Sequence, residues 1–154
     1  MTNIEKMGHL VSLRTNWADI LSEDWTWGTG LTQQKIIYVV KGDALLACDV
    51  RGAKVLEKDD RNRRAVIQLP APKVLSPRIN HHQSGPYDSS FWITPEKRDA
   101  MTQHALEKGQ DRIAQAAGCE ENIATAKANA RQVLTALWEI QGWNVEVVFD
   151  DEKR

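Results

Sequence analysis

Three histidines and one aspartate are the side chains best suited to hold a metal ion in this sequence of 154 residues. His81 and His82 are adjacent, and Asp88 and His104 follow them along the chain. Adjacent side chains of an extended segment point to opposite faces, so the histidine pair does not readily share one ion. Zinc usually needs three or four convergent ligands. The histidines are therefore weak metal candidates, and we expect no metal and no other cofactor.

The motifs of common catalytic and nucleotide-binding sites are absent from the sequence. There is no G-x-S-x-G nucleophile elbow, no P-loop and no complete G-x-G-x-x-G fingerprint. Cys119 and His104 stand fifteen residues apart, across a predicted helix and a turn, which disfavours a thiol–imidazole pair. We name no catalytic residue, and the sequence favours a binding or structural protein over an enzyme.

Large aromatic side chains gather in two predicted segments, a loop or short edge ribbon over residues 22–33 and a loop over 80–94, and are the candidate binding residues. Six tryptophans in a chain of this length is a high count. If both loops lie at one end of a sheet, their rings could form a rim for a protein, peptide or glycan. The other interpretation is a small satellite core that closes the end of the domain. The candidates are Trp25 and Trp27 in the first loop, and Tyr87, Phe91 and Trp92 in the second.

Charge and hydropathy exclude several classes of protein. The net charge is −1, which argues against a general binder of nucleic acid or acidic membranes. Asp59 and Asp60 stand beside the basic cluster Arg61, Arg63 and Arg64, so a solvated hairpin tip is favoured over a phosphate contact. No run of 18 apolar residues and no signal-peptide core occurs, so a soluble cytoplasmic domain is expected, or an extracytoplasmic one if an N-terminal anchor was removed.

The two cysteines do not form a C-x-x-C pair, so a zinc ribbon or a thioredoxin-type site is unsupported. Cys48 lies in an apolar strand pattern and is expected to be a small buried core residue. Cys119 follows a glycine that stops a helix. The spacing of the two leaves open whether they form a disulfide.

Strand patterns fill the first half of the chain. Residues 9–21 alternate, and residues 35–50 predict a hairpin of two apolar runs around Lys41-Gly42-Asp43. A second hairpin joins 53–57 to 64–69 through a charged tip. Pro70 and Pro72 cannot donate to a ladder, so the chain there lies at an edge or leaves the sheet and re-enters at Val74.

Helix patterns fill the second half. Thr94 as N-cap and Pro95 at the first helical position begin a helix over 95–117, which Gly118 stops. A second helix over 120–141 precedes a final strand over 143–149. Its expected buried stripe, with i, i+3, i+4, i+7 spacing, is Ile123, Ala126, Ala130, Val133, Leu134, Leu137 and Trp138. Together these elements predict one α+β domain over 1–154: a mostly antiparallel sheet of about six or seven strands with two long helices packed on one face.

Four strings follow one another along the chain: IIYVVKGDALLACDV, VIQLPAPKVLS, TPEKR at the start of a long helix, and LWEIQGWNVEVVF. This ordered set resembles an uncharacterised bacterial family, the domain of unknown function 4230. The resemblance covers roughly residues 8–149. It implies no activity and no site residues, because none is assigned to the family. Many members look membrane-anchored by one N-terminal helix, whereas this sequence begins directly with the domain.

Two functions follow from these observations. The first is a non-enzymatic binding or structural module that acts through protein–protein contacts, with an unknown protein partner or as a homo-oligomer. The alternative is a small ligand- or metal-binding domain, or an enzyme, with a site near residues 80–94. Neither a nucleic acid nor a membrane segment is expected to take part.

Overall fold

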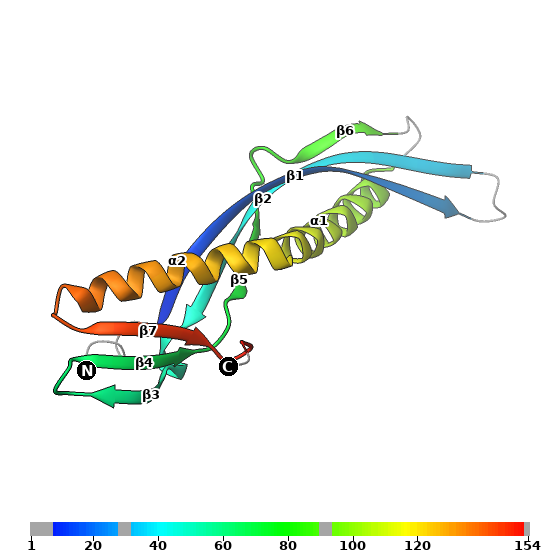
Figure 1. The fold of residues 1–154 in the computed structure, drawn as a ribbon. Helices are drawn as coiled ribbons and strands as arrows, with labels where there is room; N and C mark the ends of the chain where they lie inside the picture. Colours follow the sequence, from blue (N-terminus) through cyan, green and yellow to red (C-terminus); the bar gives the residue numbers. More distant parts are fainter. Residues whose placement is uncertain (1–7, 28–31, 90–93, 153–154) are drawn as a thin grey trace. The chain divides into compact units, whose positions relative to one another are not determined.

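The computed structural model of the chain describes residues 8–27, 32–89 and 94–152. These residues form seven strands, two α-helices and one short 3-10 helix. In chain order the elements are β1 (His9–Trp27), β2 (Thr32–Asp49), η1 (Val50–Gly52), β3 (Lys54–Asp59), β4 (Arg64–Leu69), β5 (Lys73–Ile79), β6 (Gly85–Ser89), α1 (Pro95–Ala117), α2 (Glu120–Glu139) and β7 (Asn144–Phe149). The fold class is α+β, as the sequence predicts (Figure 1).

The chain divides into two compact units. Unit 1 comprises the described residues of 1–14, 45–75 and 117–154, and unit 2 comprises those of 15–44 and 76–116. The strands also fall into two sheets. One has the order β1-β2-β5 with β6 also paired to β2, and the other has the order β3-β4-β7.

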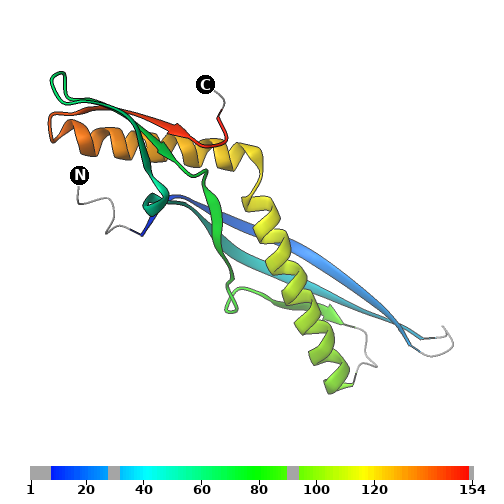
Figure 2. The same cartoon turned by 90° about the horizontal axis from the view of Figure 1, so that it is seen from below.

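Unit 1 is built on the three-stranded sheet. β3 pairs antiparallel with β4, whereas β4 pairs parallel with β7, in a register from Arg64↔Asn144 to Leu69↔Phe149. Helix α2 runs alongside β7, and a short turn joins the two (Figures 1 and 2). The parallel pair is possible because the long crossover between β4 and β7 carries both helices. The buried residues of this core are Cys48, Val50, Ala65, Ile67, Leu69, Ala130, Leu134, Trp138, Val145, Val147 and Phe149.

Unit 2 places α1 beside the apolar half of β2. Ile36 of β2 and Met101 of α1 are fully buried against each other. Gly109 lies so close to Val40 that a Cβ atom at 109 would be 2.8 Å from Val40 Cγ1. Arg112 of α1 donates to Asp19 of β1 at 2.9 Å. Helix α1 therefore covers the β-branched run of β2, although four strands lie between the two in the sequence.

The predicted bounds of the first helix and the predicted start of the second match the structure, and the second helix ends two residues earlier than predicted. α1 begins at Pro95, and the Arg98 N–H donates to the Thr94 carbonyl at 2.9 Å. α2 begins at Glu120 after Gly118, and it ends at Glu139 with Ile140 as C-cap. Gly142 has φ +77, the left-handed conformation that favours glycine after a helix end. The predicted second hairpin is also confirmed as β3 and β4.

The predicted hairpin around Lys41-Gly42-Asp43 is wrong. β2 is one continuous strand from Thr32 to Asp49, and Gly42 lies inside it. The glycine is needed for a close approach and not for a turn: a Cβ atom there would overlap the Arg78 carbonyl oxygen and lie 2.5 Å from Ile113 Cδ1.

Three further differences concern the strands. The single predicted sheet is two sheets, and Pro70 and Pro72 lie where the chain passes from β4 of one sheet to β5 of the other. β1 extends past the predicted strand end at residue 21 to Trp27, so the first part of the predicted loop or edge ribbon over 22–33 is edge strand. The predicted loop over 80–94 contains a strand, β6, which pairs antiparallel with β2.

Candidate interaction surface

Helix α2 presents one buried face to the sheet of unit 1. Its buried side chains are Ala126, Ala130, Leu134 and Trp138, each four residues after the last. Ala130, Leu134 and Trp138 share one core with the inward side chains of β4 and β7, which alternate with exposed or half-buried ones. The small side chain of Ala130 lets the helix approach the strands closely.

A second apolar stripe of α2 is open to solvent. Val133 is 52% exposed, Leu137 38% and Ile140 85%. Their i, i+4, i+7 spacing puts them on one face of the helix, with exposed Ala136 between them. We call Val133, Ala136, Leu137 and Ile140 the outer stripe. Nine large apolar side chains of the described residues are exposed, and six of them are distributed over β1, β3, β5 and β6. The outer stripe is the one place where three of them follow helical spacing.

The apolar spacing of α2 predicts Val133 and Leu137 on its buried face, and this prediction is wrong. One signal could have separated the two stripes. Residues 126, 130, 134 and 138 already form one apolar row along the helix. The further apolar residues widen the apolar face beyond this row, and the extra width can remain exposed.

Side chains of α2 also close the free edge of β7. Thr135 Oγ1 donates to the Val145 carbonyl at 3.4 Å, and Arg131 Nε donates to the Val147 carbonyl at 3.1 Å. The N–H groups of Asn144 and Asp150 donate toward β4, so the carbonyls of the alternate residues 145 and 147 point to the other side of β7. Occupied edge groups cannot accept a further strand. The contacts fix the rotation of α2, which keeps the outer stripe turned away from the sheet.

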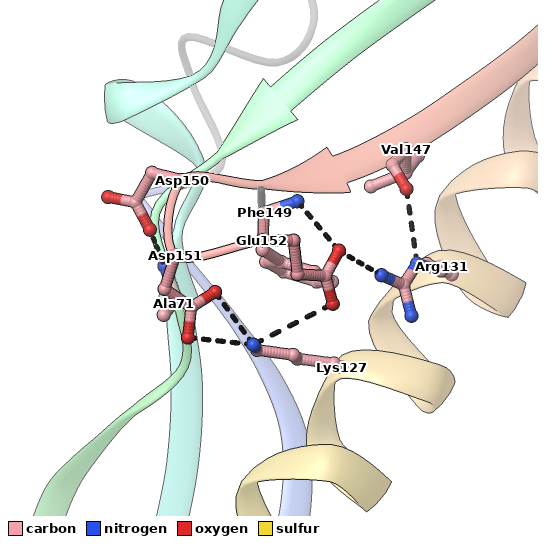
Figure 3. Close-up of polar contacts among 8 residues, drawn as sticks. All are labelled: Ala71, Lys127, Arg131, Val147, Phe149, Asp150, Asp151 and Glu152. Carbon is pink, nitrogen blue, oxygen red and sulfur yellow. Dashed lines mark hydrogen bonds and ion pairs between the residues drawn. The ribbon is translucent and has the colours of Figure 1, made fainter. Parts of the chain in front are cut away.

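A polar cluster after β7 holds the other half of α2 (Figure 3). Lys127 Nζ lies 2.6 and 2.7 Å from the two Asp151 carboxylate oxygens and 3.7 Å from Glu152 Oε1. Arg131 forms an ion pair with Glu152, which also accepts from the Phe149 N–H at 3.2 Å. The Lys127 and Arg131 cations lie 5.5 and 5.0 Å from the centroid of the Phe149 ring, within the range of cation–π attraction. We call residues 149–152 the C-terminal turn.

The charged groups of this cluster form ion pairs with one another. Hydrogen bonding from Arg131 and from the Phe149 N–H, with the fields of Arg131 and Lys127, lowers the pKa of Glu152. The Lys127 side chain is only 12% exposed. Asp150 accepts from the Ala71 N–H at 2.9 Å and ties the C-terminal turn to the segment after β4 (Figure 3). The cluster therefore stabilises the position of α2, and a hollow of about 340 Å³ beside Lys127 and Arg131 lies open next to it.

Only some of the aromatic candidates lie within the described residues. Tyr87 lies in β6 and is 79% exposed, which leaves it available for a partner. Trp25 and Trp27 are at the end of β1, an edge strand, which agrees with an edge ribbon and not with a loop. Phe91 and Trp92 lie outside the described residues. Whether these five rings share one surface stays a prediction.

The metal candidates are placed on different elements. His81 and His82 are exposed in the turn after β5, Asp88 lies in β6, and His104 is exposed on α1. Among the residues that the structure describes, no group of three or more His, Cys, Asp or Glu side chains could hold a metal ion. Cys48 is buried and Cys119 exposed, and both are free thiols. Burial raises the pKa of Cys48 to about 11, so its thiol is not suited to nucleophilic chemistry.

The basic tip of the second hairpin is organised by its two acids. Asp59 accepts from the N–H groups of Arg61 and Asn62 at 3.0 and 3.2 Å, and Asp60 forms an ion pair with Lys58 at 2.7 Å. Both carboxylates thus stabilise the turn, as expected of a solvated hairpin tip.

The described residues therefore define an α+β protein in which one helix, fixed against a three-stranded sheet with a parallel pair, carries an uncovered apolar stripe. The chain belongs to the family described as "Protein of unknown function (DUF4230)", which matches residues 2–148 and confirms the resemblance found in the sequence. No curated protein and no solved structure matches the chain. No helix within the described ranges is long and apolar enough to span a membrane.

Proposed function

We propose that the protein is a binding module that acts through protein–protein contacts, and that the outer stripe of α2 is its contact surface. The observation that carries the proposal is the exposure of Val133, Leu137 and Ile140 on one helix face. Solvent-exposed aliphatic side chains that are grouped together and rimmed by polar residues are typical of interaction sites. Gln132 and Gln141 are exposed polar residues at its two ends.

The energetics favour a protein as the occupant. Burial of apolar surface contributes roughly 25 cal/mol per Å², so covering three partly exposed aliphatic side chains stabilises a complex by several kcal/mol at most. No deep cavity is needed for such a contact, because a partner helix can lay its own apolar face on the stripe. The contacts of Thr135 and Arg131 with β7 keep the helix rigid, so little conformational entropy is lost when a partner binds.

The test is photo-crosslinking of the full chain in the cells that make it. A benzophenone amino acid is placed at position 137 and, as a control, at position 128, where an exposed alanine lies on a different face of α2. We expect one identified protein segment, read by mass spectrometry, to be attached at 137 and not at 128. No protein adduct at 137, or equal adducts at both positions, would reject the proposal.

A further inference from the structure

We draw no further inference here: the strongest candidate, the open hollow of about 450 Å³ that His9, Lys73 and Leu75 help to line between the end of β2 and the start of β5, carries none because nothing in the described part of the chain shows which ligand or partner covers it.

Discussion

Gly42 of β2 packs so closely against Arg78 of β5 that any side chain at position 42 would overlap the Arg78 carbonyl oxygen. The obstacle is a backbone atom, so it cannot turn aside as a flexible side chain would. Ile113 of α1 closes the same space, because its Cδ1 atom lies 2.5 Å from the point that a Cβ atom of residue 42 would occupy. The absence of a side chain at position 42 therefore lets β2, β5 and α1 pack closely together in unit 2.

Gly42→Ala should destabilise the protein by about 3 kcal/mol, the upper end of the usual cost of overpacking a core. Urea unfolding followed by circular dichroism measures the change. Gly85→Ala is the matched control, because nothing lies within 4 Å of a Cβ atom at that strand position. It should change the free energy of unfolding by less than about 0.5 kcal/mol. Equal effects of the two substitutions would contradict the close approach at Gly42.

Gly109→Ala tests the contact between α1 and β2. Alanine is favoured over glycine in a helix by about 1 kcal/mol, but here its Cβ would lie 2.8 and 3.0 Å from the two Val40 methyl carbons. Val40 is fully buried. We expect Gly109→Ala to lower the free energy of unfolding by about 1 kcal/mol in the wild type. In a Val40→Ala background the same substitution should raise it by about 1 kcal/mol. A double-mutant cycle by urea unfolding gives the coupling free energy between positions 40 and 109. A value near zero would show that the contact between these two residues does not form.

The two thiols should differ sharply in reactivity. Cys48 is fully buried, and burial raises the pKa of its thiol to about 11, whereas Cys119 is exposed. The thiolate is the reactive form, so a thiol reagent at pH 8 should modify one cysteine in the native protein and two in denaturant. Cys119→Ser should abolish native labelling. Native labelling of that variant at the rate of an unfolded chain would show that Cys48 is accessible.

Acid should release the C-terminal turn. The pKa of Glu152 in the folded protein is lowered, first by its bond from Arg131. Its contribution to stability is therefore fully present above the ordinary glutamate pKa of about 4.3 and is lost as the pH falls below that value through the lowered folded pKa. Because the Glu152 side chain is 35% exposed, Glu152→Gln should cost less than about 1 kcal/mol at pH 7.

Hydrogen exchange measures this release, because the Phe149 N–H donates to Glu152. Its protection should fall with pH below about 4 in the wild type. The protection should already be reduced at pH 7 in Glu152→Gln. The exposed Glu146 of β7 offers the control Glu146→Gln, which should leave the protection unchanged. Protection of Phe149 that is independent of both pH and Glu152 would rule out the carboxylate as the holding group.

The sequence by itself determined the elements whose signals are local. Thr94, Pro95 and Gly118 set the ends of α1, and alternation of apolar and polar residues predicted β7. Helix caps, the fixed backbone angle of proline and the alternation of apolar and polar side chains act within one helical turn or one strand. They can therefore be recognised without knowing which elements pack against that segment. The α+β class follows from the order of these elements.

Tertiary structure decided what depends on residues far apart in the chain. Lys41-Gly42-Asp43 has the composition of a turn, and only the approach of Arg78 and Ile113 shows why a glycine is needed inside a strand. The periodic pattern of α2 suits a helix with a broad apolar face, but the sheet covers one row of it and leaves Val133, Leu137 and Ile140 exposed. Burial is a property of the partner surface as well as of the side chain, so the sheet decided which apolar row of α2 is core and which is candidate contact surface.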